Sequence, residues 1–176
     1  MAREFSAGGV VLRRMKGAWW VAAIHPRRTN DDKVTRSAKR RGRIFALPKG
    51  TIDPGEKAVE TAAREIREET GVHADAVRKL GDIKYVYVRS WGDRQRVFKV
   101  VSFFLFLYRG GRLGDIPANM RHEVESAEWV PLEEAAKRLS YTGEKDMARA
   151  AEKYVAAHPE LEESTSSPRR RGDAEE

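Results

Sequence analysis

Residues 50–72 read Gly-Thr-Ile-Asp-Pro-Gly-Glu-Lys-Ala-Val-Glu-Thr-Ala-Ala-Arg-Glu-Ile-Arg-Glu-Glu-Thr-Gly-Val, and they carry the clearest structural pattern in the chain. Pro54-Gly55 predicts a turn. The apolar residues after it recur at helical spacing, so they are predicted to lie on one face of a helix. These residues are Val59, Ala62, Ala63 and Ile66. Glycine commonly ends a helix in the left-handed conformation, so Gly71 is predicted to close this one.

Three glutamates of this predicted helix, Glu65, Glu68 and Glu69, lie at positions i, i+3 and i+4 and therefore share one side. Like charges at this spacing destabilise an isolated helix by roughly 0.2–0.5 kcal/mol per pair, and the macrodipole disfavours anions near the C-terminus. A divalent cation would offset both costs, and oxygen ligands suit Mg²⁺, for which Mn²⁺ can substitute. The alternative is a solvated helix face with local ion pairs to Arg64 and Arg67.

The spacing of the whole stretch carries a family resemblance. Gly50, five residues, Glu56, seven residues and then Arg-Glu-Ile-Arg-Glu-Glu-Thr-Gly-Val resembles the Nudix box at every specified position. Solvation alone gives these residues no reason to occur together. The resemblance implies an α/β fold, a Nudix-type α/β/α sandwich with a mixed β-sheet, over residues 1–158. It also implies an enzyme, a Nudix-type pyrophosphohydrolase that uses Mg²⁺ to cleave a diphosphate linkage in a nucleotide-like substrate.

The resemblance assigns roles to individual acids of the motif. By that likeness Glu68 and Glu69 are the principal metal ligands, and the Gly50 carbonyl completes a coordination sphere. Glu65 belongs to the same metal site and orients or deprotonates the attacking water.

Four further motif residues are expected to shape the site. Arg64 and Glu56 would tie the helix and the preceding loop together electrostatically, and Arg64 would orient the catalytic groups. Gly55 and Gly71 would be structural positions of the turn and of the helix end. The alternative for Arg64 is an ordinary exposed helix arginine.

Nudix proteins often add one more carboxylate from a loop beyond the box. Glu123 is the candidate for this catalytic and metal-binding role, since it lies six residues before Trp129, and Glu125 is its rival. Either could be a plain surface acid near His122. The sequence alone does not choose between them.

Candidate substrate-binding residues lie outside the helix. Lys49, in the Pro-Lys-Gly sequence that leads into the motif, is placed to meet a phosphate, or else is a solvated lysine. Tyr85 and Tyr87 share one strand face and could stack on a base or pack in the core. Lys99 is unusual in an apolar strand, and either an outward face or a phosphate contact explains it. The Pro-Lys-Gly sequence resembles the diadenosine polyphosphate hydrolase and MutT-like nucleotide-cleaning branches.

Apolar patterning outside the motif predicts the remaining elements. Strands are expected at 5–12 and 19–24 as a hairpin, at 83–88 and 97–108 as a long pair joined by a turn at 90–93, and at 128–130. Helices are expected at 132–139 and 147–155.

Two segments are predicted to lack regular structure. Between His25 and Arg43 the chain is polar and rich in Lys and Arg, so residues 28–43 are predicted to be a mobile basic loop insertion. Arg27, at its start, is a candidate to bind distal phosphates. From Pro159 the chain is charged and serine-rich, so residues 159–176 are predicted to be a disordered tail.

Composition limits the class of protein. At 176 residues and 40% hydrophobic content, the chain can bury the core of one domain. It has no cysteine, which excludes disulfides, thiolate metal sites and a thiol nucleophile. No signal segment and no run of roughly 18 apolar residues is seen, so a cytoplasmic protein with no membrane partner is expected.

The net charge of +7 favours anionic partners such as a nucleotide or polyphosphate. Nucleic acid is a possible partner but not the favoured one, because charge alone, including Arg169–Arg171, specifies no function. The leading hypothesis for the substrate is a diadenosine polyphosphate. Its longer phosphate chain would pair with more of the cationic side chains in the Pro-Lys-Gly sequence and in the basic segment around residues 27–43. The alternatives are an oxidised (d)NTP pyrophosphohydrolase, an RNA 5′-pyrophosphohydrolase and a non-catalytic Nudix-like regulator that binds a ligand. The oligomeric state stays open.

Overall fold

The computed structural model describes residues 1–27, 43–89 and 91–166. The predicted mobile loop, apart from Arg43, and the last ten residues of the predicted tail lie outside this part. No helix within it is long and apolar enough to span a membrane. In chain order the elements are β1 (Ala2–Met15), β2 (Ala18–Pro26), β3 (Lys49–Thr51), α2 (Ala58–Thr70), β4 (His73–Val88), β5 (Arg96–Gly110), the 3₁₀ helix η1 (Ala118–Met120), β6 (Val124–Pro131), α3 (Leu132–Arg138), α4 (Thr142–Ala157) and α5 (Leu161–Ser166).

The strands of this described part form one mixed sheet in the order β4-β5-β1-β2-β6, with β3 paired to β1. β1 and β5 run parallel, whereas the other pairs are antiparallel. The predicted β1–β2 hairpin and the predicted pairing of β4 with β5 are both confirmed. Because β3 pairs with the first half of β1, its residues lie beside Ser6, Ala7 and Gly8 in the middle of the sheet.

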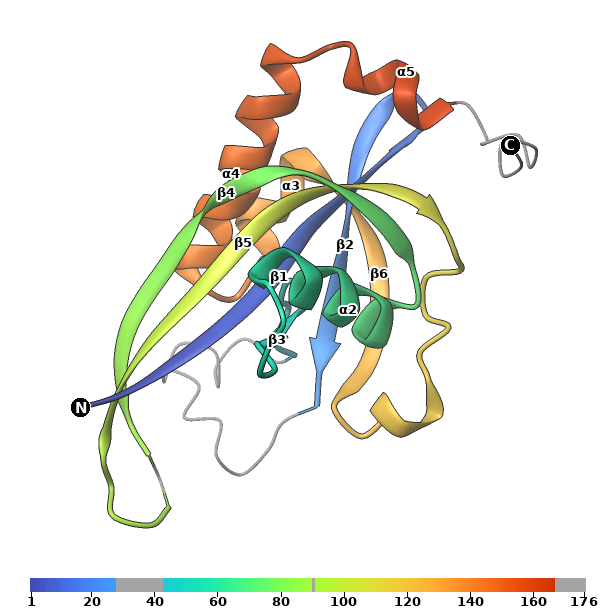
Figure 1. Cartoon of the computed structure of the whole chain (residues 1–176). Helices are drawn as coiled ribbons and strands as arrows, with labels where there is room; N and C mark the ends of the chain where they lie inside the picture. Colours follow the sequence, from blue (N-terminus) through green and yellow to red (C-terminus); the bar gives the residue numbers. More distant parts are fainter. Residues whose placement is uncertain (28–42, 90, 167–176) are drawn as a thin grey trace, which may run out of the picture.

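Helices cover both faces of the sheet (Figure 1). Alternate residues of a strand point to opposite faces, and β1 divides its side chains in this way. Val10 and Leu12 pack in a core cluster with residues of α3 and α4, while Ala7 and Val11 pack in a second cluster with α2. The predicted α/β/α sandwich is therefore confirmed.

Helix α2 forms where the apolar period predicts it. Ala62 and Ile66 are fully buried on its inner face. Gly71 ends it in the left-handed conformation, with φ 83°, and its N–H donates to the Arg67 carbonyl at 2.9 Å. A side chain at Gly71 would also collide with the carbonyl oxygen of Asp115, so glycine is required there for two reasons.

β4 and β3 differ most from the sequence prediction, whereas β1 and β6 are only longer than predicted. β4 begins at His73 rather than at Ile83, because its first half is a polar edge strand with register shifts, which no apolar run marks in the sequence. β3 was not predicted, since three residues carry no periodicity.

The prediction that residues 159–176 are disordered was wrong for the segment 161–166, which forms the short helix α5. Leu161 packs against the core cluster on the α3–α4 face. Glu162 pairs with Arg14 of β1 at 3.3 Å, and Arg109 of β5 donates to the Ser164 carbonyl at 3.1 Å. Composition could not reveal these contacts, because they come from distant strands.

Candidate active site

Arg64 of α2 holds the helix to the loop before it. Its Nε and Nη2 donate to the two oxygens of Glu56, each at 2.9 Å, so the predicted electrostatic tie is present. Glu56 also accepts hydrogen bonds from the backbone N–H of Asp53 and the hydroxyl of Thr61. Hydrogen bonds from Arg64 are the main cause that lowers the pKa of the Glu56 carboxyl to about 2. Gly55, in the turn before it, has φ 84°, which favours glycine.

Two of the motif glutamates are buried against β3. Glu69 is 7% exposed, and its Oε2 accepts the backbone N–H of Lys49 at 2.9 Å. The Glu65 carboxylate lies so close to the Cα of Gly50 that a side chain at position 50 would overlap it. The absence of a side chain at Gly50 therefore lets α2 bring two carboxylates onto the backbone of β3.

Arg64 also contacts the outer side of this group. Its Nη1 donates to Glu65 at 2.9 Å and to Glu68 at 3.1 Å. Glu68 is half-buried and lies one helical turn beyond Arg64, as i,i+4 neighbours do. The guanidinium thus links Glu56, Glu65 and Glu68.

The glutamates interact strongly through their charges. Burial raises the pKa of Glu69 to about 8, with further contributions from the charges of Glu65 and Glu123 and an opposing one from Lys49. Burial also raises the pKa of Glu65, and Glu68 and Glu123 add to this against the effect of Arg64. The charge of Glu123 therefore acts on the two buried acids, although this residue is far from them in sequence.

The donor set fits a hard divalent cation in its chemistry and its charge. Carboxylate and carbonyl oxygens are the ligands that Mg²⁺ and Mn²⁺ prefer, and a cation would relieve the cost of burying Glu65 and Glu69. Within residues 1–27, 43–89 and 91–166, no three acidic or histidine side chains are yet grouped closely enough to hold an ion. One oxygen of Glu65 and one oxygen of Glu68 form ion pairs with Arg64 in this structure.

The two loop acids occupy different surroundings. Glu123 is exposed, lies 3.4 Å from His122 and interacts electrostatically with Glu65 and Glu69. Glu125 forms an ion pair with Arg43 at 3.1 Å. The assignment of Glu123 as the additional carboxylate stays a prediction, with Glu123 the loop acid whose charge acts on Glu65 and Glu69.

Arg27 anchors the loop that carries Glu123. Its backbone N–H donates to the Glu123 carbonyl at 2.8 Å, and its Nε donates to the Arg121 carbonyl at 2.7 Å. The sequence suggested a phosphate contact for this arginine. The structure shows that its Nε is committed to the loop backbone.

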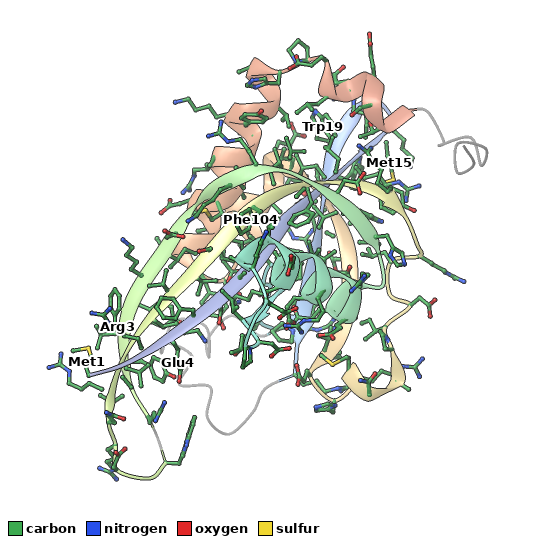
Figure 2. All side chains as sticks on the ribbon, in the orientation of Figure 1. Met1, Arg3, Glu4, Met15, Trp19 and Phe104 are labelled. Carbon is green, nitrogen blue, oxygen red and sulfur yellow. The ribbon has the colours of Figure 1, made fainter. Side chains whose placement is uncertain are left out.

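The candidate base- and phosphate-binding residues lie on one face of the sheet, near its projecting end. Tyr85, Lys99 and Glu4 are cross-strand neighbours in register, and the ring centroids of Tyr85 and Tyr87 are 6.2 Å apart. Tyr85 is 43% exposed, whereas the Tyr87 hydroxyl donates to Glu4 at 2.6 Å. Lys99 is half-buried, 3.9 Å from Glu4. Figure 2 shows Glu4 on β1, close to the end of the sheet where the chain begins.

Sequence reasoning missed two acids of this region, Glu4 and Glu144. Glu144, in the first turn of α4, is 2% exposed, and its two oxygens accept the Leu47 N–H at 2.6 Å and the Lys49 ammonium at 2.8 Å. An acid at a helix start is ordinary, because the macrodipole favours it there, so the sequence carried no signal. Glu4 likewise reads as one polar residue of an alternating strand.

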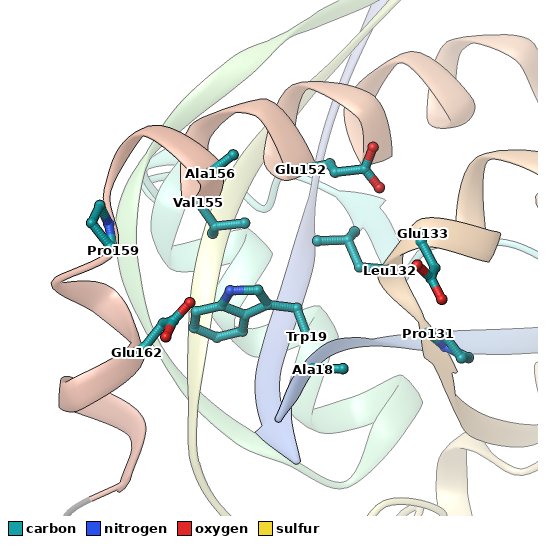
Figure 3. Close-up of a pocket in the computed structure, with 10 residues that line it drawn as sticks. All are labelled: Ala18, Trp19, Pro131, Leu132, Glu133, Glu152, Val155, Ala156, Pro159 and Glu162. Atoms are coloured by element: carbon teal, nitrogen blue, oxygen red, sulfur yellow. The ribbon is translucent and has the colours of Figure 1, made fainter. Parts of the chain in front are cut away.

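A cavity of about 450 Å³ lies elsewhere, between the start of β2, the start of α3 and the end of α4 (Figure 3). Trp19, Leu132 and Val155 supply apolar walls, and three glutamates also line it. None of its lining residues belongs to the 49–71 segment or to the Glu4–Lys99 group. The cavity is therefore separate from the candidate active site.

Comparison with known proteins places this site in a family. A family model described as the NUDIX domain matches residues 6–157. The chain is 37% identical over 177 residues to "Putative mutator protein MutT4" of Mycobacterium tuberculosis, covering 96% of this chain and 64% of that protein. It is 32% identical over 129 residues to an 8-oxo-(d)GTP phosphatase of Mycolicibacterium smegmatis, covering 73% of this chain and 32% of that protein. The chain thus spans less than two thirds of either relative.

Solved structures agree on the fold. The crystal structure of a C. elegans Ap4A hydrolase binary complex superposes with a TM-score of 0.65 and 19% identity, covering 88% of this chain and 98% of that one. The NUDIX domain of Shewanella oneidensis NrtR, complexed with ADP ribose, superposes with a TM-score of 0.63 and 16% identity, covering 88% of this chain and 90% of that one. With its motif, its sandwich and the domain match over most of its length, the chain belongs to the Nudix family.

Proposed function

We propose that this chain is a divalent-metal-dependent hydrolase that cleaves a diphosphate linkage in a nucleoside polyphosphate. The observation that carries the proposal is the burial of two carboxylates against β3, with Glu65 at the backbone of Gly50 and Glu69 at the N–H of Lys49. Concentrated negative charge of this kind is costly without a cation. Nudix hydrolases generally use divalent metal ions, which supports the same reading.

The residues that would hold the metal are Glu65, Glu68, Glu69 and Glu123, with the Gly50 carbonyl. Their oxygen donors suit Mg²⁺, and Mn²⁺ as a substitute. When bound, the cation supplies Lewis acidity toward the phosphoryl oxygens and makes water a better nucleophile.

Glu65 is the proposed proton acceptor for the attacking water. Its carboxylate is buried against Gly50, and burial raises its pKa, which makes the carboxylate a stronger base. Arg64 orients it through the 2.9 Å hydrogen bond from Nη1. Glu56 in turn fixes Arg64 through two hydrogen bonds, so the orientation of the base depends on the loop that begins the motif.

For the substrate we propose a diadenosine polyphosphate. Two lysines, Lys49 and Lys99, lie near enough for the charge of Lys49 to lower the pKa of Lys99, which burial lowers most. A chain of several phosphates would neutralise both ammonium groups, and Tyr85 beside Lys99 offers an exposed ring for a base. A relative supports this choice: the chain is 28% identical over 112 residues to a bis(5′-nucleosyl)-tetraphosphatase of Mus musculus.

An oxidised nucleoside triphosphate is the second candidate substrate. The observation that favours it is the higher identity to the mycobacterial relatives, one named as a mutator protein and one as an 8-oxo-(d)GTP phosphatase. A triphosphate is shorter, so it would place fewer charges near Lys99.

A substrate panel with identified products tests the proposal. Diadenosine tetraphosphate, 8-oxo-dGTP, dGTP, ADP-ribose and a 5′-triphosphorylated RNA are incubated with the protein and Mg²⁺, with and without a chelator. We expect chelator-sensitive cleavage, fastest for diadenosine tetraphosphate. Faster cleavage of 8-oxo-dGTP or of the RNA would transfer the assignment to that substrate, and no cleavage of any compound would refute the proposed activity.

A further inference from the structure

Glu144 is an unusually buried acid for a helix start. Its side chain is 3% exposed, and each of its oxygens has one partner in the segment that leads into the Nudix motif. Oε1 accepts the backbone N–H of Leu47, and Oε2 accepts the ammonium of Lys49. The carboxylate therefore holds both the backbone and the side chain of one short segment.

Lys49 connects this acid to the candidate metal site. Its backbone N–H donates to Glu69 of α2, while its side chain reaches Glu144 of α4. The Pro48 carbonyl between Leu47 and Lys49 accepts the N–H of Gly9 at 3.1 Å, which fixes the same segment to β1. Helices on opposite faces of the sheet are thus joined through the residue before Gly50.

Stability alone is a poor explanation for this ion pair. Burying two charges costs about as much as their attraction returns, and apolar replacements of buried ion pairs are often neutral or stabilising. The pair does, however, fix a flexible lysine side chain in one orientation. Burial lowers the pKa of Lys49, but the attraction of Glu144 outweighs this and leaves the pKa raised, so the ammonium stays charged.

The Lys49 ammonium has more hydrogen-bond donors than the contact with Glu144 uses. Its side chain is 30% exposed, and it has three N–H donors, of which one is directed to Glu144. The ring of Tyr141 lies 5.2 Å away and confines the ammonium on another side. The ammonium is therefore restrained on two sides, while the Lys49 side chain as a whole is partly exposed.

We propose that Glu144 is a positioning residue for diphosphate cleavage, which holds the Lys49 ammonium where it meets a substrate phosphate beside the metal site. The inference rests on the proposed function, because it needs a phosphate at Lys49. Glu144 acts through Lys49 and through the Leu47 backbone rather than by touching the reacting atoms. Loss of its charge alone, with the acceptor for the Leu47 N–H kept, should therefore disturb the kinetics only as far as Lys49 is disturbed.

A double-mutant cycle tests this dependence. Glu144→Gln keeps an acceptor for the Leu47 N–H but removes the charge that holds Lys49. We expect it to lower kcat/KM by roughly tenfold to a hundredfold, with Lys49→Gln similar and the double variant no worse than Lys49→Gln alone. Glu152→Gln, an exposed acid on the same helix, is the matched control and should match the wild type. Wild-type kinetics for Glu144→Gln, or losses that simply multiply, would overturn the proposal.

A binding measurement separates this inference from the proposed activity. Calorimetry with inorganic tripolyphosphate and Mg²⁺ should show weaker binding in Glu144→Gln than in the wild type, by a similar factor, whether or not a nucleotide is cleaved. If the panel fails but this loss is seen, the lysine site stands and the proposed activity falls. If the wild type cleaves nucleotides but the variant binds tripolyphosphate equally well, Glu144 has no positioning role.

A second variant covers the case in which Glu144→Gln does not fold. Glu144→Asp keeps the charge but shortens the side chain by one methylene, so it cannot reach Leu47 and Lys49 together without movement. Positioning predicts a reduced kcat/KM in this folded variant. A wild-type value would show that only the charge matters, against the proposal.

Discussion

The Lys49 backbone N–H donates to Glu69 Oε2 at 2.9 Å, although these residues lie on different elements and twenty positions apart. This N–H is a neutral donor, and the Glu69 residue that accepts it is only 7% exposed. The charges of Glu65 and Glu123 repel the charge of Glu69. A buried carboxylate is stable when further positive charge or hydrogen bonds compensate it. This relationship makes Glu69 the acid that a bound cation would stabilise most.

Replacing Glu69 should abolish turnover without harming the fold. Glu69→Gln keeps an acceptor for the Lys49 N–H but removes a charge from the metal site, so we expect kcat to fall at least about a hundredfold. Melting of the metal-free variant should occur no lower than that of the wild type, because the burial cost of the charge is gone. Glu68→Gln should lose turnover similarly. Unfolding of either variant would indicate a structural role.

Adding a side chain at Gly50 should displace Glu65. The Cβ of Gly50→Ala would overlap the Glu65 carboxylate, so that acid must move from the β3 backbone. A misplacement of about 1 Å in a reacting group lowers kcat by about a hundredfold, so we expect a loss of that order. Gly110→Ala, where no atom lies within 4 Å of the added Cβ, is the matched control. Equal kcat for both variants would exclude the proposed role of Glu65 at this position.

The two loop acids should differ in their effect on the reaction. Glu123→Gln should lower kcat by roughly tenfold to a hundredfold, because this carboxylate interacts with Glu65 and Glu69. Glu125→Gln removes only an exposed pair with Arg43 and should leave kcat unchanged. Steady-state kinetics at saturating Mg²⁺ measures both, and a larger loss in Glu125→Gln would reverse the assignment.

The Arg64–Glu56 pair should make stability depend on pH on the acid side. The pKa of Glu56 is lowered from 4.5 to about 2 in the folded protein, mainly by hydrogen bonds from Arg64. The folded state therefore releases this proton more readily than the unfolded state, so the stabilisation is fully present above pH 4.5. It is lost as the pH falls through about 2.

Comparing unfolding of the wild type and Glu56→Gln across this range isolates the effect. The other groups titrate in both proteins, so the difference in the free energy of unfolding reports on Glu56. We expect this difference to be largest above pH 4.5 and to shrink toward pH 2. A difference that stays constant over the range would mean that the charge of Glu56 does not contribute.

Local geometry explains which parts of the molecule could be predicted from the sequence. A helix repeats every 3.6 residues, so the spacing of Val59, Ala62 and Ile66 predicts the face that packs on the sheet. Gly71 marks the end of that helix because few other residues adopt its φ of 83°. The short segment α5 was not predicted, because its stability comes from contacts of Leu161 and Glu162 with distant elements.

The sequence by itself determined the helix, the common origin of Glu65, Glu68 and Glu69 on it, and the family. The burial of Glu69 against the Lys49 N–H, the effect of the Glu123 charge on Glu69 and the contact of Glu144 with Lys49 from 95 positions away became visible only in the folded chain. The difference lies in how far apart along the chain the interacting residues are. Backbone hydrogen bonding sets positions three or four residues apart, whereas contacts between distant residues depend on how the sheet and its covering helices pack.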